Sequence, residues 1–421
     1  MFWRGFRHSL TLFLLISVVG GGAVAVGDTG QRVRAFTRVN EFDYVEWSLV
    51  AAFAKLKQAA LGSQNYLDGP AQKKFVEDYL ALVAQIQISQ GELSRLYADP
   101  DQAAVAAQIN ELETRLDQLN VQLRQTAPLA EAIFQEQVQA VAADLGLSNG
   151  GQSLPPVFYR STPLPWALII SPREAIQQEA NISLKTEMTL EEHIGVEDAV
   201  AVALDVSTLV VPVGGVGTYP TMVAQSSDLN WLADVVAHEW IHNYLTRHPL
   251  GLLYDRNQDL HTMNETTASI AGKEIGAALI ARFYPERVPP PPVIQPENLT
   301  AEAAPEAPLI PVFEFRSEMH ATRVRVDELL AAGEVDEAEA YMETRRLFFW
   351  ENGFTIRKLN QAYFAFYGSY ADSPVGPAGA DPVGEAVREL RARSDTLVAF
   401  LKQMAFLSSF EDLQSILEEG N

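Results

Sequence analysis

The chain has 421 residues, of which 48% are hydrophobic and 20% charged. Its length is sufficient for about two or three domains with apolar cores. Its composition excludes a chain that is disordered or collagen-like as a whole. Its 31 basic residues stand against 54 acidic ones, a formal net charge of −23, and such an acidic surface repels phosphate backbones and argues against nucleic acid as a partner. Because the chain has no cysteine, disulfides, thiolate metal sites and cysteine nucleophiles are excluded, and any metal must be held by His, Asp or Glu.

The N-terminal segment contains an uncharged, apolar run over residues 9–27, preceded by Arg4 and Arg7. A run of this length is about what one helix needs to cross a bilayer, and the basic flank favours an N-terminus that stays in the cytoplasm. We therefore expect residues 1–27 to form a membrane anchor that places the rest of the chain outside the cytoplasm. The alternative is a cleaved signal peptide and a secreted protein, because positions 23–25 resemble a cleavage site.

Residues 28–147 have the pattern of a helical region. Apolar residues recur at helical spacing over residues 47–61 and 72–96, and a further helix carries a seam in which spacings of three and four alternate. A seam of about two heptads predicts an antiparallel helical hairpin with coiled-coil-like packing. The alternative is that the seam binds a helical partner, whose identity the sequence does not indicate. The seam consists of Ile109, Leu112, Leu116, Leu119 and Leu123.

The pattern changes over residues 148–285, where apolar runs bounded by Pro and Gly predict strands at 166–171 and 206–213. A further strand is predicted at 218–223, and we interpret it as an edge strand because Pro220 cannot donate a ladder hydrogen bond. Helices are predicted over residues 229–246, which Asp228 can cap, and over residues 263–283.

A proline-rich stretch over residues 286–312 is typical of an extended surface connection. The chain is helical again over residues 313–421, with predicted helices at 317–332, 336–346, 356–370 and 383–418. We expect this C-terminal region to complete the unit formed by residues 148–285.

One short motif carries chemistry, the sequence His238-Glu239-Trp240-Ile241-His242 within the predicted helix. Residues i and i+4 lie on one face of a helix, so the two imidazoles can converge on a single Zn²⁺ ion. Glu239 lies beside the first histidine and can reach a water molecule at the metal without being a ligand, which is the position of a general base.

A catalytic zinc has three protein ligands, and two residues compete for the third position. His248 lies six residues after His242, the spacing found in metzincins, but Leu245 stands where that family turns sharply out of the helix at a glycine. Glu265 lies at the start of a long, alanine-rich helix. We favour Glu265.

The combination of this motif with Asn264-Glu265 and Ala268 resembles the gluzincin clan of zinc metallopeptidases and is similar to bacterial membrane-anchored proteins described as predicted aminopeptidases. The resemblance covers about residues 200–420, and only the two short motifs are specific. It implies an α+β, zincin-like fold: a mostly helical chain with a small mixed sheet packed on the helix that bears the motif. It also implies that Glu265 is a zinc ligand and that the substrate is a peptide or protein, bound along an edge strand.

The resemblance leaves some residues in question. Ser269 stands where the clan often places an aspartate that orients the first histidine. Gluzincins also use a tyrosine or histidine to stabilise the developing oxyanion, and Tyr363 is a candidate, although aromatic residues at this helical spacing are more often part of a core. His193, next to glutamates, is expected to be exposed, and His261 to lie at the surface or behind the metal ligands.

The preferred hypothesis is therefore a zinc peptidase in which Glu239 is the general base. Two alternatives stay open: a non-catalytic, membrane-anchored envelope scaffold with a structural or vestigial zinc site, and a zinc amidase acting on a non-peptide substrate. The sequence does not distinguish an exopeptidase from an endopeptidase, because no acidic motif for a substrate amine is evident.

Overall fold

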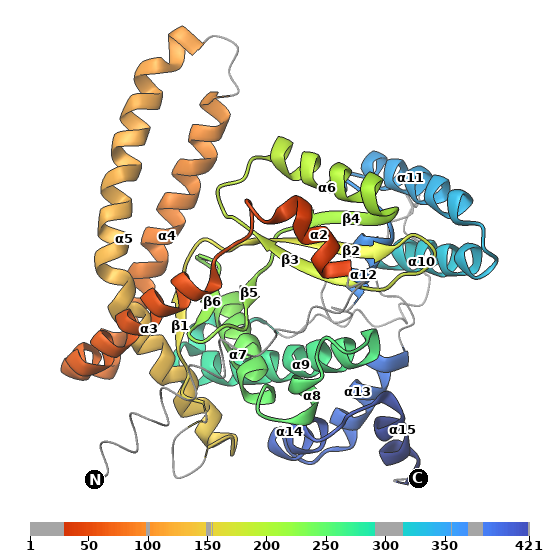
Figure 1. The fold of residues 1–421 in the computed structure, drawn as a ribbon. Coiled ribbons are helices and arrows are strands. Elements are labelled where there is room, and N and C mark those ends of the chain that lie inside the picture. The colour runs from red at the N-terminus through yellow and green to blue at the C-terminus, as the bar shows by residue number, and fades with distance from the viewer. Residues whose placement is uncertain are drawn as a thin grey trace, which may run out of the picture.

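The computed structural model describes residues 29–97, 102–148, 153, 155–290, 315–354, 356–368 and 382–419. Helices make up most of this part of the chain, and its six strands form two sheets of three strands each (Figure 1). The prediction of a mostly helical α+β chain is therefore confirmed.

The prediction of a transmembrane helix and of a membrane-anchored protein requires correction. Within the described residues, no helix combines the length and the apolar composition needed to cross a membrane. The segment on which the anchor and the signal peptide were predicted, residues 9–27, lies outside the described residues.

Helices α4 (Gly69–Tyr97) and α5 (Gln102–Asp144) form the predicted hairpin, which projects from the rest of the molecule (Figure 1). All five residues of the predicted seam are buried, with exposed fractions of 5–8%. Leu116, Leu119 and Leu123 of α5 share one apolar cluster with Val83 and Ile86 of α4. The seam thus packs within the chain, as the hairpin interpretation predicts.

The first sheet has the order β3-β2-β4 and is antiparallel throughout. Successive residues of a strand point to opposite faces, and here both faces are covered. Leu168 and Ile170 contact a cluster that includes helices α2 and α6, whereas Ala167 and Ile169 contact one that includes α10, α11 and α12. This two-sided burial explains why β2 has an uninterrupted apolar sequence. The elements are β2 (Trp166–Pro172), β3 (Ala180–Leu184), β4 (Val206–Val211), α2 (Thr29–Thr37), α6 (Leu190–Leu204), α10 (Phe315–Ala331), α11 (Val335–Glu351) and α12 (Gln361–Tyr367).

The second sheet has the order β1-β6-β5, with β1 (Tyr159–Ser161) parallel and β5 (Gly215–Val216) antiparallel to β6 (Thr221–Val223). The prediction that residues 218–223 form an edge strand is wrong, because β6 is the central strand. Only residues 221–223 enter the ladder, so Pro220 lies before the strand and its missing N–H does not interrupt the pairing. Among the described strands of this sheet, β5 and β1 lie at the edges.

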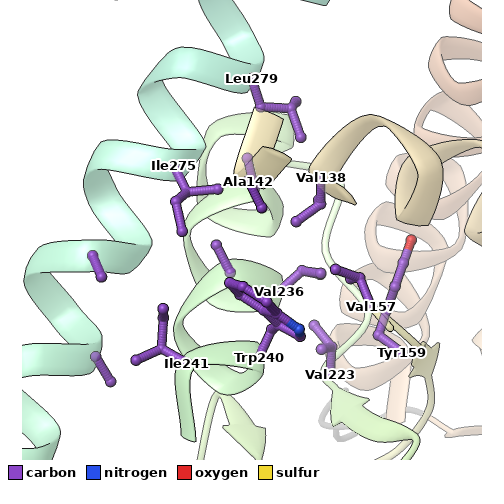
Figure 2. Close-up of a cluster of buried hydrophobic side chains, with 14 of the residues drawn as sticks. Val138, Ala142, Val157, Tyr159, Val223, Val236, Trp240, Ile241, Ile275 and Leu279 are labelled. Atoms are coloured by element: carbon purple, nitrogen blue, oxygen red, sulfur yellow. The ribbon is translucent and has the colours of Figure 1, made fainter. Parts of the chain in front are cut away.

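Helix α7 (Leu229–Leu245) carries the histidine motif and lies between the second sheet and helix α9 (Gln258–Phe283) (Figure 1). Trp240 of α7 lies in the main apolar cluster, surrounded by side chains from α9, α5 and the sheet (Figure 2). Helix α9 begins earlier than predicted because the Asn257 side chain caps it, accepting from the backbone N–H of Leu260 at 2.9 Å.

Three C-terminal helices complete the core around α9. The predicted helix over residues 383–418 is divided into three, because Thr396 caps a new helix and residues 406–409 interrupt the next. These helices bury Val387, Phe400 and Leu413 in the cluster that contains α7 and α9. The elements are α13 (Pro382–Arg393), α14 (Leu397–Ala405), α15 (Phe410–Glu419), α3 (Tyr44–Leu61), α8 (Pro249–Leu252) and the short 3-10 helices η1 (Ser63–Tyr66) and η2 (Pro285–Arg287).

Two glycines of α9 allow it to cross α7 closely. A Cβ atom added at Gly272 would lie 2.9 Å from both the backbone oxygen of Asp234 and the Cβ of His238, and one at Gly276 would lie 3.0 Å from the backbone nitrogen of Asp234. Since Cβ atoms do not approach other atoms this closely, any larger residue would push the two helices apart.

Replacing Gly272 with alanine is therefore expected to lower the free energy of unfolding by about 1–3 kcal/mol relative to the same replacement at Gly195. Gly195 is the matched control because it lies within α6, where an added Cβ meets no neighbouring atom within 4 Å. Both variants gain the same helix propensity, so the difference isolates the helix contact. Urea unfolding of the two variants measures it, and equal stabilities would contradict the close crossing.

Candidate metal centre

Helix α7 places the two histidines of the motif side by side. The Asp228 side chain caps the helix by accepting from the backbone N–H groups of Asn230 and Trp231 at 2.9 and 3.1 Å. One turn separates His238 from His242, and their Nε2 atoms lie 3.0 Å apart. Both nitrogens therefore point toward one place, as the i, i+4 spacing predicts.

Glu265 reaches the same place from α9. Its Oε2 lies 3.4 Å from Nε2 of His238, and its Oε1 lies 3.6 Å from Nε2 of His242. The three groups each offer one ligand atom, and these atoms lie within 4.8 Å of one another. Glu265 is 2% exposed, and its buried Oε2 has no hydrogen-bond partner among the described residues. An unsatisfied buried carboxylate oxygen facing two imidazoles is suited to a cation.

The competing residue, His248, does not join this group. It stands at the N-terminus of α8, and its ring packs 5.1 Å from that of Tyr244 and 5.3 Å from that of Phe406, measured between centroids. The chain turns into α8 after His248, with Gly251 packed against the end of α7. The structure thus brings Glu265, and not His248, to the two histidines.

Two further residues that sequence analysis did not identify hold the ligands in place. Oδ1 of Asn264 lies 2.8 Å from Nδ1 of His242, so that Nδ1 donates and Nε2 keeps its lone pair for a metal. The Tyr254 hydroxyl donates to Oε1 of Glu265 at 2.5 Å. Asn264 directly precedes the ligand glutamate, and this adjacency was the only sequence signal for its role.

The electrostatics of the group differ between its two carboxylates. Burial would raise the pKa of Glu265, but attraction to the two imidazoles, to that of His242 most strongly, holds it well below its usual range. Burial raises the pKa of Glu239, and Glu265 adds to this rise while the two histidines oppose it. Glu265 is therefore fixed as an anion, whereas Glu239 is poised to accept a proton.

A glycine-rich segment forms the wall beside Glu239. A Cβ atom at Gly215 would lie 2.4 Å from Oε1 of Glu239, and one at Gly217 would lie 3.1 Å from the Cβ of His242. Gly215 therefore accepts only glycine while the carboxylate keeps its place, and a Cβ atom at Gly217 would press on His242. The segment includes strand β5, so an exposed sheet edge lies directly beside the candidate base.

A cavity of about 530 Å³ opens on these residues. Glu239, His242 and Glu265 line it together with aromatic side chains of distant segments, among them Tyr44 and Phe366. This volume and this mixture of apolar walls with a few polar groups are typical of sites for small or extended ligands.

Tyr44, at the start of α3, is another hydroxyl-bearing residue of this wall that sequence analysis missed. The segment before it pairs with β3, where Phe42 donates its backbone N–H to the carbonyl of Ser183 at 2.9 Å. The Tyr44 hydroxyl donates to Oγ of Ser183 at 2.7 Å, and burial raises the pKa of Tyr44, with Glu239 adding to the rise. Its position far upstream of the motif gave no sequence signal.

Tyr363, the predicted oxyanion residue, lies elsewhere. It is buried in the cluster between α12 and the first sheet, with its ring centroid 4.6 Å from that of Tyr367, and it does not line the cavity. On α12 the residue that reaches the cavity is Phe366. Tyr363 thus occupies the core position that its helical spacing equally predicted.

Two other histidines are buried, one against expectation and one in a position that the sequence allowed. His193 is 4% exposed and packs 4.6 Å from the ring of Trp166, so the prediction of an exposed residue is wrong. His261 is 7% exposed, and its ring lies 4.5 Å from that of Tyr254. His261 therefore lies behind the candidate metal ligands, next to the tyrosine that holds Glu265.

Comparisons with known proteins add no assignment: no family model matches the chain, no curated protein matches its sequence and no solved structure matches its fold. What this centre does must therefore be argued from its own geometry.

Substitution of the third ligand tests the composition of the centre. Glu265→Ala is expected to weaken zinc binding by more than about 100-fold, because two histidines alone leave an open coordination shell. Loss of a residue that only hydrogen-bonds to a ligand typically weakens metal binding by about 10–100-fold, so the expected effect is larger than that. His248→Ala is the matched control and should bind zinc like the unmodified protein. Competition with a chromophoric chelator measures both affinities, and loss of zinc in the His248 variant alone would reverse the assignment.

Proposed function

We propose that this protein is a zinc-dependent peptidase in which His238, His242 and Glu265 hold the ion. The observation that carries the proposal is the convergence of these three side chains beside a buried glutamate that is not one of them. Two histidines and one carboxylate with a fourth position left open are the ligand set of catalytic zinc in metallopeptidases. The donor set contains no sulfur, as the absence of cysteine requires.

In this proposal Glu239 transfers the protons. Bound zinc supplies a Lewis acid for the carbonyl oxygen and lowers the pKa of water. The Glu239 carboxylate takes a proton from the attacking water as the water oxygen adds to the carbonyl carbon. Glu239 then passes this proton to the amine nitrogen when the C–N bond breaks. The raised pKa of Glu239 supports this role, because a base whose pKa lies nearer neutrality also releases its proton readily.

Strand β5 offers a place for the substrate backbone. Gly215 and Val216 line the cavity and pair on one side only, with β6. An extended peptide can therefore add to this edge and pass in front of Glu239. This assignment moves the predicted substrate-binding strand from residues 218–223 to β5.

The Tyr44 hydroxyl is the candidate for stabilising the oxyanion, in place of Tyr363. It lies in the wall of the same cavity and donates its O–H to Ser183. If the Ser183 hydroxyl donates to Tyr44 instead, the Tyr44 O–H is free to turn to a developing negative charge. The crossing of α9 over α7, the sheet beside α7 and the His-His-Glu group together support a zincin-like arrangement of the gluzincin type.

The base is tested by Glu239→Gln. This variant should keep its zinc, because Glu239 is not a ligand, and should lose hydrolysis by about 10²–10⁴-fold. Cleavage of a mixed peptide library, read by mass spectrometry, measures activity, and elemental analysis measures zinc. A zinc-loaded Glu239→Gln variant that still cleaves peptides would exclude Glu239 as the base. An unmodified, zinc-loaded protein that cleaves no peptide of the library would contradict the proposed peptidase function.

The oxyanion role is tested by Tyr44→Phe with Tyr363→Phe as its matched control. Loss of the Tyr44 hydroxyl is expected to lower kcat by about 10²–10³-fold with zinc content and KM little changed, as for other oxyanion donors. Tyr363→Phe should leave kcat unchanged because its hydroxyl does not reach the cavity. The opposite pattern would restore Tyr363 to the mechanism.

A further inference from the structure

Helix α3 is attached to the rest of the molecule by few buried residues. Of its 18 residues only Ala51 and Lys55 are buried. Its large apolar side chains are solvent-exposed, with Phe53 at 70%, Leu56 at 65% and Leu61 at 61%. A helix of this composition normally buries an apolar face, so α3 lacks the contacts that its sequence is suited to make.

A cavity of about 690 Å³ lies between α3 and α5, and residues of η1 and β1 also line it. We call it the α3–α5 cavity. It is larger than the 530 Å³ cavity at the metal centre and shares no lining residue with it. One wall is aliphatic, formed by Leu61 of α3 with Leu123, Pro128 and Leu129 of α5. Its volume lies within the range of small-molecule sites.

The side chains that line this cavity are mainly positive, whereas the protein as a whole is strongly negative. Four basic side chains and one acidic side chain line it, in a chain with a net charge of −23. The acid, Glu131, is already engaged: it forms a buried ion pair with Lys55 and accepts the backbone N–H of Ser161 at 2.9 Å.

The other three cations, Lys57, Arg124 and Arg160, have no carboxylate within 4.0 Å among the described residues. Burial lowers the pKa of Lys55, Glu131 opposes this, and Arg160 lowers it further. The positive charge of Arg160 therefore repels the charged Lys55 of the buried pair. An anion in the cavity would reduce this repulsion.

We propose that the α3–α5 cavity binds an amphiphilic anion, a small molecule with a carboxylate or phosphate head and an aliphatic chain. Lys57, Arg124 and Arg160 would hold the head, since guanidinium groups pair well with carboxylate and phosphate oxygens. The chain would lie along the aliphatic wall and cover the inner side of α3. This site is independent of the peptidase proposal, because no residue belongs to both.

Calorimetric titration of the full chain with three probes below their micelle concentrations tests the proposal. Octyl phosphate has both parts of the ligand, inorganic phosphate has only the head, and octyl glucoside has only the chain. Octyl phosphate should bind at least about tenfold more tightly than either of the others, because charge-assisted hydrogen bonds and apolar burial each contribute more than a factor of ten.

A double variant locates the binding. The variant Lys57→Gln with Arg124→Gln removes two cations of the cavity. Both side chains are exposed, so the fold should be retained. The double variant should bind octyl phosphate at least about tenfold more weakly. Arg115→Gln is the matched control, because Arg115 is exposed on the same helix α5 but lies outside the cavity. This variant should bind octyl phosphate with unchanged affinity.

Three results would overturn the proposal. Equal affinities for inorganic phosphate and octyl phosphate would mean that the site takes a free anion and does not use the aliphatic wall. Equal affinities for octyl glucoside and octyl phosphate would indicate adsorption on the exposed face of α3. An unchanged affinity in the double variant would place the binding elsewhere. Zinc content and peptide cleavage play no part in any of these readouts.

Discussion

The close crossing of α7 and α9 is the contact on which the metal centre depends. Two of its candidate ligands, His238 and His242, come from α7 and the third, Glu265, comes from α9, so the separation of the helices sets the distances among them. Gly272 lies two turns after Glu265 on the same side of α9 and packs directly on His238. The absence of a Cβ atom there is what lets a glutamate side chain reach both imidazoles.

Burial then gives the two carboxylates of the site different tasks. Both Glu239 and Glu265 are removed from water, which alone would raise both pKa values. Glu265 is attracted to both imidazoles and accepts a hydrogen bond from Tyr254, and so stays ionised. Glu239 faces glycine backbone and the charge of Glu265, and becomes the better proton acceptor. Opposed pKa shifts in neighbouring acids are a mark of acid–base sites, and a bound dication would balance the charge that both place in the interior.

Local patterns predicted the parts of the site that lie on single helices, because the i, i+4 spacing and the caps are decided within a few residues. The motif helix and its Asp228 cap follow from such patterns. Glu265 lies on another helix, and its convergence with the histidines was expected from the resemblance to gluzincins. Long-range placement did not follow: Tyr44 reaches the cavity only because its segment pairs with β3, and His193 is buried only because Trp166 of a separate strand packs on it. The central position of β6 was missed for the same reason, since its partner β1 lies far away in the sequence.

The upstream helical region is part of the same structural unit as the metal centre. Phe134 and Val138 of α5 lie in one apolar cluster with Trp240, which stands between His238 and His242 in the sequence of α7. Figure 2 shows Val138 and Trp240 in this cluster. Tyr44 of α3 closes one wall of the cavity, and α2 covers one face of the first sheet. Without residues 29–148, the side of α7 that carries Trp240 would be partly exposed to water, and each large apolar side chain left exposed costs about 1.5–3 kcal/mol. The geometry of the centre therefore rests on packing contributed by helices that carry none of its ligands.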